Sequence, residues 1–298
     1  IVVDGQTETS QGVLNGAANN TAIIEAGGTL TVGSDAISAT GTGNTITNSG
    51  TITSTSGDGI QSNGDDAIIT NTNSGTITAN SVNVDGIDSR GANATITNSG
   101  TITATNNGIY SSGAKATITN SGTITSTRSG ILSYGVDAII TNSGTITSTL
   151  FEGIFSSGDD ATITNSGTIT STRAGILSFG ANTVINNSGH ITGTNYAVRG
   201  GTSDSLTLNL LKGSQLMGAI DLGGADNDTV NIHGGSVSAT LTFVSTENIN
   251  LLGPGLKLSG DVVAVSVDGT ADAARSVVLS TITSDIHDQI AQRTYLPA

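Results

Sequence analysis

The sequence of 298 residues contains no cysteine, no tryptophan and only two prolines. Without cysteine the chain cannot form disulfides, bind a metal through thiolates or use a thiol as a nucleophile. Charged residues are 11% of the chain, less than half their usual share. This scarcity argues against ordinary disorder, because disordered segments usually combine low hydrophobicity with dense charge. A hydrophobic share of 35% is enough for a core if the apolar residues are regularly placed.

Positive charge is especially scarce: nine Lys and Arg stand against 23 Asp and Glu, which gives a net charge of −14. This balance disfavours binding to nucleic acid or to anionic lipid, since both need clustered positive charge. No apolar run approaches the roughly 18 residues of a membrane-spanning helix. The first ten residues lack the basic and apolar regions of a signal peptide, so we expect that such a peptide was removed or never existed.

Glycine, with 41 residues, is abundant, and it marks an internal repeat. The Gly of an Asn-Ser-Gly motif recurs every 22 to 25 residues, at positions 50, 75, 100, 122, 144, 167 and 189. A second motif, Gly-Ile-x-Ser-x-Gly, keeps phase with it over segments 59–64, 86–91, 108–113, 130–135, 153–158 and 175–180. Each unit therefore holds three short segments with apolar residues at period two, separated by turn residues. This pattern is typical of β-strands.

Three strands per repeat of about 22 residues, with no room for helices, predict an all-β fold, the parallel β-helix or β-solenoid. The general rule for parallel crossovers predicts a right-handed coil. Successive coils stack at about 4.8 Å, so equivalent residues should form ladders. An inward-facing Ile ladder is expected from Ile52, Ile77, Ile102, Ile124, Ile146, Ile169 and Ile191. A ladder of amides bonded from coil to coil is expected at a turn, from Asn48, Asn73, Asn98, Asn120, Asn142, Asn165 and Asn187.

The Gly that follows this Asn is expected to adopt a positive φ, where a Cβ would be costly. The repeat also divides the chain. We expect irregular N-terminal coils or a cap, a regular β-helix, less regular coils and a short C-terminal α-helix, over residues 1–43, 44–200, 201–267 and 268–298 respectively.

Two features resemble the passenger domains of Gram-negative autotransporters, which use type V secretion. The "ITNSGTIT" repeats are similar to those of many such passengers, and segment 267–293 is similar to the linker helix that precedes the outer-membrane barrel. Apolar residues lie near helical spacing in that segment, at Val277, Val278, Ile282, Ile286 and Ile290. The resemblance implies a passenger plus linker, with the barrel cleaved or left out, at the cell surface or secreted. The absence of cysteine agrees with export through a narrow pore.

The repeats offer little that would support catalysis. There is no nucleophile elbow, no phosphate-binding loop and no His pair at metal-binding spacing. The basic residues of the repeats look scattered along the sequence: Arg90, Lys115, Arg128 and Arg173. We therefore expect no enzymatic activity. A secreted, polysaccharide-active β-helix enzyme stays an alternative, and it would need a cluster of acids or bases assembled across coils.

One metal site is conceivable. Segment 223–231, "GGADNDTVN", resembles a calcium-binding repeat, although Asp226 stands where the pattern has a Gly. The carboxylates of Asp221, Asp226 and Asp228 could hold Ca²⁺, which prefers hard oxygen ligands. The other interpretation is an acidic turn between coils, since one imperfect copy has no stacked neighbours to complete a site.

The positions that vary between coils carry more information than those that repeat. In Gly-Ile-x-Ser-x-Gly, the Ile and Ser should point inward and the two variable residues outward. Between residues 108 and 180, these outward positions and the turn before them carry aromatic, aliphatic and Arg side chains, which are favoured in contact surfaces. We predict a contact strip formed by Tyr110, Arg128, Leu132, Tyr134, Phe151, Phe155, Arg173, Leu177 and Phe179.

These observations predict a non-enzymatic adhesin. Its partner would be a host or abiotic surface, or another copy of the protein on a neighbouring cell, as in aggregation or biofilm formation. No nucleic acid and no cofactor are expected, apart from the Ca²⁺ considered above, and the outer membrane would be met only through the missing barrel. A further alternative is an ice-binding solenoid, because the Thr-Ile-Thr strands would form flat double files of Thr.

Overall fold

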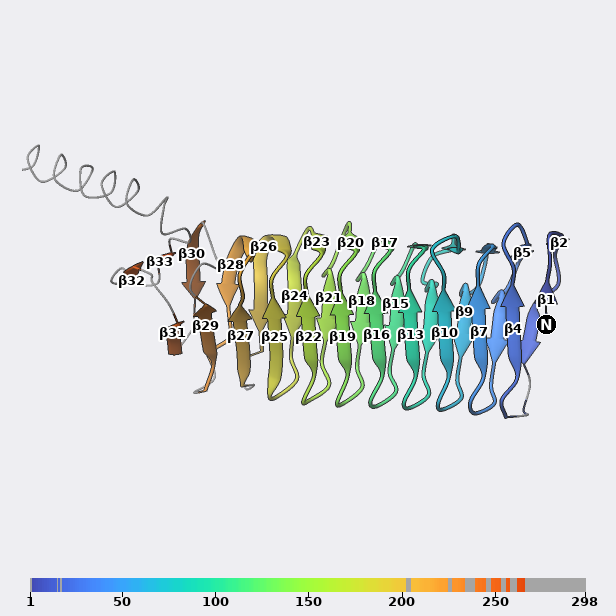
Figure 1. Ribbon diagram of the computed structural model, residues 1–298, viewed down its shortest axis with the longest axis horizontal. Coiled ribbons are helices and arrows are strands. Elements are labelled where there is room, and N and C mark those ends of the chain that lie inside the picture. The colour runs from blue at the N-terminus through green and yellow to red at the C-terminus, as the bar shows by residue number, and fades with distance from the viewer. Residues whose placement is uncertain are drawn as a thin grey trace, which may run out of the picture.

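The computed structural model describes residues 2–14, 16, 18–201, 205–224, 227–233, 239–244, 248–252, 256–257 and 262–265. Within these ranges the chain forms strands and turns and contains no helix, so no helical membrane span is present there either. The strands wind into one elongated parallel β-solenoid, in which each turn of the chain lies beside the previous one (Figure 1). The predicted fold class is confirmed. The predicted helix at 268–298 lies outside the described residues. The pairing of the strands does not define the handedness of the coil, so the right-handed coil stays a prediction.

Three parallel ladders of strands run along the solenoid. Sheet A has 12 strands. They are β1 (Val2–Val3), β4 (Thr21–Ile24), β7 (Thr45–Asn48), β10 (Ile68–Asn71), β13 (Thr95–Asn98), β16 (Thr117–Asn120), β19 (Ile139–Asn142), β22 (Thr162–Asn165), β25 (Thr183–Asn187), β27 (Leu206–Leu210), β29 (Thr229–His233) and β31 (Asn248–Leu252). This sheet carries the first strand of every coil.

The other two strands of each coil form ladders B and C. Ladder B consists of β2 (Thr7–Glu8), β5 (Thr29–Val32), β8 (Thr51–Ser54), β11 (Thr76–Ala79), β14 (Thr101–Ala104), β17 (Thr123–Ser126), β20 (Thr145–Ser148), β23 (Thr168–Ser171), β26 (His190–Gly200), β28 (Gln215–Asp221) and β30 (Ala239–Val244). Ladder C consists of β3 (Gly12–Leu14), β6 (Ile37–Ala39), β9 (Ile60–Ser62), β12 (Ile87–Ser89), β15 (Ile109–Ser111), β18 (Ile131–Ser133), β21 (Ile154–Ser156) and β24 (Ala174–Ser178), and it ends on β26. The remaining strands, β32 (Leu256–Lys257) and β33 (Val262–Val265), pair antiparallel, and β33 also pairs with β30.

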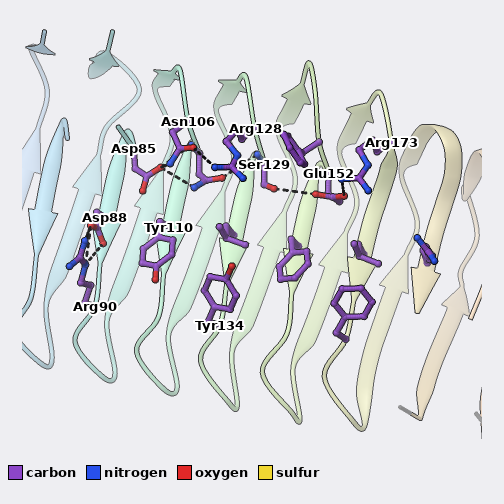
Figure 2. Close-up of a pocket in the computed structure, with 17 residues that line it drawn as sticks. Asp85, Asp88, Arg90, Asn106, Tyr110, Arg128, Ser129, Tyr134, Glu152 and Arg173 are labelled. Carbon is purple, nitrogen blue, oxygen red and sulfur yellow. Dashed lines mark hydrogen bonds and ion pairs between the residues drawn. The ribbon is translucent and has the colours of Figure 1, made fainter. Parts of the chain in front are cut away.

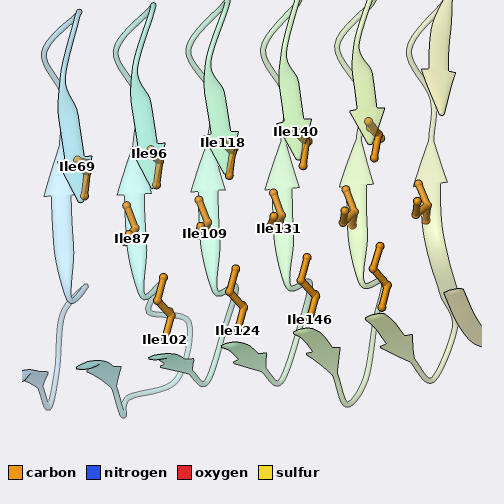
Figure 3. Close-up of a cluster of buried hydrophobic side chains, with 14 of the residues drawn as sticks. Ile69, Ile87, Ile96, Ile102, Ile109, Ile118, Ile124, Ile131, Ile140 and Ile146 are labelled. Atoms are coloured by element: carbon orange, nitrogen blue, oxygen red, sulfur yellow. The ribbon is translucent and has the colours of Figure 1, made fainter. Parts of the chain in front are cut away.

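The core is a set of Ile columns, one from each ladder, as Figure 3 shows. Within one coil Ile118, Ile124 and Ile131 come from sheet A, ladder B and ladder C, and all three are fully buried. The ladders are in register, so each Ile stacks on the equivalent Ile of the next coil. Burying one such side chain contributes about 1.5–3 kcal/mol. The predicted Ile ladder is therefore confirmed, and it accounts for the repetition of Ile in the regular coils.

An amide ladder runs the length of the regular coils at the end of each sheet A strand. Each Asn side chain donates from Nδ2 to Oδ1 of the next one at 2.7–2.8 Å, from Asn48 through to Asn187. The coil-to-coil bonding is confirmed, with one correction. In the second of these coils the ladder uses Asn71, which is buried, while the predicted Asn73 is exposed. The turn after this strand is two residues longer there, so the motif does not align by its Gly.

The prediction of positive φ for the Gly after Asn-Ser was wrong. None of these Gly residues is in the left-handed region, which the Asn, Asp and Lys of another turn occupy, for example Lys115 at 59° and Asp137 at 57°. Gly is needed in Asn-Ser-Gly for space. A Cβ on Gly122 would lie 2.1 Å from the carbonyl oxygen of Gly100 on the neighbouring coil. The close approach of successive turns, not the backbone angle, excludes a side chain.

Candidate binding groove

All nine residues of the predicted contact strip line a single groove with a volume of about 500 Å³. The groove runs over ladder C and over the turn that leads into it, so it follows the solenoid axis across several coils (Figure 2). The residues of the predicted strip come from three rows, each with one residue per coil, and the residues directly before Gly-Ile also line the groove. Whether the groove binds a partner stays a prediction at this point, but the structure brings the residues together.

The three rows are defined by their positions around the Gly-Ile-x-Ser-x-Gly motif. The inner row is the first variable position, where ladder pairing stacks Asp88, Tyr110, Leu132, Phe155, Leu177 and Arg199. The outer row is the second variable position, with Arg90, Ser112, Tyr134, Ser157 and Phe179. The turn row lies two residues before the motif, with Asn106, Arg128, Phe151 and Arg173.

Four aromatic rings form a continuous zigzag between the inner and outer rows. The ring centroids of Tyr110 and Tyr134 are 5.8 Å apart, those of Tyr134 and Phe155 are 5.8 Å apart, and those of Phe155 and Phe179 are 5.6 Å apart. All three pairs meet edge to face, an arrangement that contributes about 0.5–1.5 kcal/mol beyond simple burial. The two outer-row rings are the more open, with 47% of Tyr134 and 44% of Phe179 exposed. The zigzag therefore forms a rigid apolar wall whose outer rings can be reached by a partner.

Leu177 differs from the prediction, because it is buried rather than exposed. In the ladder it stands between Phe155 and Arg199, whose longer side chains flank it on both sides. Leu132 has the same position two coils earlier and is half-buried between Tyr110 and Phe155. These Leu residues thus form the floor of the groove and the aromatic residues form its wall.

The opposite wall is polar and rich in Arg. Figure 2 shows Arg128, Ser129, Glu152 and Arg173 on the side of the turn, across from Tyr110 and Tyr134. The guanidinium carbons of Arg128 and Arg173 lie 4.9 and 5.3 Å from the ring centroid of Phe151, as cation–π contacts. Arg173 also forms an ion pair of 3.4 Å with the buried carboxylate of Glu152. Contacts within the chain therefore hold the guanidinium groups of Arg128 and Arg173 in place.

The sequence suggested that the Arg residues are scattered, but the structure brings them together. All four Arg residues in the described part of the chain line the groove: Arg90, Arg128, Arg173 and Arg199. Arg90 donates through Nε and Nη2 to both carboxylate oxygens of the buried Asp88, with a shortest distance of 2.6 Å. Arg199 approaches Asp221 at 4.0 Å. The sequence could not show this convergence because the four residues occupy three different rows.

A polar ladder that the sequence reasoning missed supports the turn side of the groove. It uses the residue directly before Gly-Ile. At Asp58, Asp85 and Asn107 the side chain of this residue accepts the backbone N–H of its equivalent on the next coil, whereas the hydroxyl of Ser129 donates to Glu152. Asp85 donates its N–H to Asp58 Oδ1 at 2.7 Å, and Asn107 donates to Asp85 Oδ1 at 2.8 Å. The signal in the sequence was a polar residue at that position in coil after coil: Asp35, Asp58, Asp85, Asn107, Ser129 and Glu152.

Burial within this ladder raises the pKa of Asp58 from 3.8 to about 7, and the nearby Asp88 and Asp85 charges add to the rise. Burial likewise raises the pKa of Asp85, against hydrogen bonds from Asn107 and Asn106 that lower it. Two of the three carboxylates that line the groove are paired with Arg, and Asp85 accepts hydrogen bonds from its Asn neighbours. The contacts of these acids therefore stabilise the turns and orient the Arg side chains.

The candidate calcium site is only partly within the described residues, since Asp226 lies outside them. Asp221 accepts the N–H of Gly223 at 3.1 Å and approaches Arg199, while Asp228 is buried and accepts the N–H of Leu206 at 2.7 Å. Across the described ranges no three His, Asp or Glu side chains are grouped closely enough to hold a metal ion. Asp221 ends strand β28 and Asp228 lies just before β29, and the Ca²⁺ site stays a prediction.

Comparison with known proteins gives no match for the chain among protein-family models, curated proteins or solved structures. The structure itself shows a parallel β-solenoid with a groove over ladder C.

Proposed function

We propose that this protein is an autotransporter passenger that acts as a non-enzymatic adhesin at the surface of a Gram-negative cell, and that the groove over ladder C is its contact surface. The partner is a host or abiotic surface, or a copy of the protein on a neighbouring cell. The assignment to autotransporters rests on the resemblance of the repeats and of the 267–293 segment. Coil-by-coil stacking suits such export, since each coil needs only its neighbour to fold.

One observation carries the proposal. The nine residues that depart from the repeat in coils 108–180 line one groove, and the aromatic and Arg side chains most favoured in contact surfaces are concentrated there. Of the residues in the groove, Tyr134 and Phe179 are large and more than two-fifths exposed. An outward position without a binding role needs no large apolar side chain, and equivalent positions elsewhere in the chain carry Thr or Ser.

The contacts of the groove acids favour binding over catalysis. A hydrolase would need an acid and a base free to reach a substrate. Asp88 is nearly fully buried and bonded by both oxygens to Arg90, and Glu152 is buried against Arg173 and Ser129. Asp85 accepts hydrogen bonds from both Asn106 and Asn107. These engagements support a binding surface with fixed polar groups.

The test compares a set of substitutions in the groove with a control set of exposed apolar residues on another face. The groove set is Tyr134→Ser, Phe155→Leu and Phe179→Ser, which places in each row a residue that another coil already carries there. The control set is Ile68→Thr and Ile139→Thr, since these are exposed apolar residues of sheet A at positions where adjacent coils have Thr.

Beads coated with each protein are scored for aggregation with one another and for attachment to polystyrene and to cultured epithelial cells. We expect the groove set to lose at least one of these activities of the wild type, and the control set to keep them all. Full activity in the groove set would overturn the proposal. Antibodies against the chain should also label intact cells that produce it, and labelling only after permeabilisation would contradict the surface location.

A further inference from the structure

The groove repeats every two coils. Segments 106–113 and 151–158 read "NNGIYSSG" and "FEGIFSSG", with an aromatic residue in the inner row and Ser in the outer row. Segments 128–135 and 173–180 read "RSGILSYG" and "RAGILSFG", with Leu in the inner row and an aromatic residue in the outer row. The two kinds of coil alternate along the axis. This alternation does not occur in ladder B, where the equivalent outward residues of the same coils are all Thr.

The alternation produces a lattice with a period of two coils, about 9.6 Å, because each coil advances the stack by about 4.8 Å. The aromatic rings step from inner to outer row and back with this period. On the polar wall, Arg128 and Arg173 recur with the same period and flank Phe151. A ligand that matched this surface would be long, would lie along the axis and would itself repeat after two units.

An extended peptide fits this lattice poorly. Its residues advance by about 3.3 Å, so they would fall out of step with coils spaced at about 4.8 Å. The backbone of ladder C is already paired on both sides along the groove, so it has no free edge to which a peptide strand could add. Recognition has to rely on side chains alone, and these are aromatic faces on one wall with planar guanidinium and amide groups on the other.

We propose that the groove binds a linear polysaccharide with a two-sugar repeat, with the chain parallel to the solenoid axis and one sugar per coil. This inference rests on the proposed adhesin function and names its ligand class. In an extended glycan each pyranose ring advances the chain by close to the spacing of one coil, and alternate rings are turned over. Successive sugars therefore differ in the face that they turn to the same wall, with a period of two sugars. Along the groove the rings of Tyr110, Tyr134, Phe155 and Phe179 alternate between the inner and the outer row with the same two-coil period.

The polar wall points to one acidic group per repeat. Arg128 forms no ion pair with any described residue, and its contacts are the ring of Phe151 and a hydrogen bond of 3.5 Å to Asn106. A guanidinium held in this way can form a bidentate contact with the carboxylate of a uronic acid. Arg173 repeats the guanidinium two coils later, where Glu152 already pairs with it at 3.4 Å. The concentration of Arg in this groove on a protein of net charge −14 favours an acidic over a neutral chain.

The test measures binding of two hexasaccharides to the purified chain by isothermal titration calorimetry. Hyaluronan hexasaccharide carries one carboxylate per two sugars, and cellohexaose is neutral with the same two-sugar alternation. We expect both to bind, with hyaluronan the tighter by tenfold or more at low salt. Arg128→Gln should remove most of that preference while leaving cellohexaose binding within about twofold of the wild type.

A phase variant tests the geometry. The double change Leu132→Tyr and Tyr134→Ser keeps the number of aromatic rings but moves one ring from the outer to the inner row, and it copies the arrangement of segment 108–113. We expect at least tenfold weaker binding of both sugars with an unchanged melting temperature. Unchanged affinity in the phase variant would overturn the proposed register, and failure of the wild type to bind either sugar would overturn the ligand class.

The two proposals fail separately. If neither sugar binds and the groove set of substitutions still abolishes attachment or aggregation, the groove is a contact surface and its ligand is not a glycan. If the groove set leaves attachment unchanged, the adhesin proposal fails whatever the sugars do.

Discussion

Ladders B and C belong to the same coils and differ in what they repeat. Along ladder B the outward residues Thr123, Thr145 and Thr168 stack in register without change. Along ladder C the outward residues change at every coil, from Tyr110 to Leu132 to Phe155, while the inward Ile and Ser between them do not. The backbone and the core are the same on both faces, so the difference lies wholly in side chains that the fold leaves free.

The comparison separates what builds the solenoid from what is added to it. Repeated residues fill the Ile columns, make the amide ladder and leave room where coils approach each other. The residues that vary are not needed for stacking, since their neighbours in the ladder have other side chains. Substitutions in the first group should therefore cost stability, and substitutions in the second should cost binding.

The largest effect is expected in the core. Ile124→Ala should lower the free energy of unfolding by about 2–5 kcal/mol. Ile124 is fully buried, so its truncation leaves a cavity in the Ile column that the neighbouring side chains do not fill. The matched change Leu132→Ala on the groove floor should cost about 1 kcal/mol or less. Chemical denaturation of the purified proteins measures both. Equal losses would break the distinction between the repeated and the variable positions.

Gly122→Ala should come next, with a loss of about 1–3 kcal/mol. The added methyl group would meet the carbonyl oxygen of Gly100 at 2.1 Å, and that oxygen is backbone, which can move only if the coils separate. Ser121→Ala, at an exposed position of the same turn, is the control and should change stability by less than about 0.5 kcal/mol. Thermal unfolding followed by circular dichroism is sufficient. A neutral Gly122→Ala would mean that Asn-Ser-Gly is not fixed by close packing.

Asp58→Asn tests the polar ladder beside the groove through the pH dependence of stability. The folded protein binds the Asp58 proton more tightly than the unfolded chain, since its pKa rises from 3.8 to about 7. Asp58 therefore destabilises the fold progressively as the pH rises from about 4 to about 7. The stability of Asp58→Asn relative to the wild type should increase over that range and be constant below it. A difference that is independent of pH would show that burial of Asp58 has no such cost.

The smallest effect should be a gain. Ser133 is one of several inward Ser residues of ladder C whose hydroxyls are buried with no hydrogen-bond partner in the described structure. Ser133→Ala removes an unsatisfied polar group and should stabilise the protein by about 1 kcal/mol. Ser178→Ala is the contrast, because the hydroxyl of Ser178 donates to Thr183 at 2.9 Å, and its loss should destabilise. Loss of stability in both variants would mean that the inward Ser column is bonded after all.

Much of the fold could be read from the sequence because the solenoid repeats in one dimension. A residue such as Ile124 has the same neighbours in every coil, so period and polarity were enough to place it in the core. The role of Gly122 was missed because it depends on how closely two turns approach, a distance that no local pattern contains. Asn73 was misplaced because one turn is longer than the others.

The candidate site was predictable in part. The aromatic residues stood out because they interrupt a repeat, and they needed only the alternation of strand side chains to be placed on one face. The convergence of Arg90 and Arg199 on the same groove required the relative positions of three rows across a turn. The burial of Leu177 and the engagement of Glu152 depend on the lengths of neighbouring side chains, which ladder positions alone do not give.

The most direct test of the account is a saturation scan of residues 106–180 that scores folding and attachment separately for each substitution. We expect substitutions that reduce attachment without reducing folding to cluster at the outward positions of ladder C and in the turn row, led by Arg128, Tyr134, Phe155 and Phe179. Substitutions of the outward Thr residues of ladder B should leave both scores near the wild type. Attachment-specific losses spread evenly over the three faces, or concentrated on ladder B, would contradict the account.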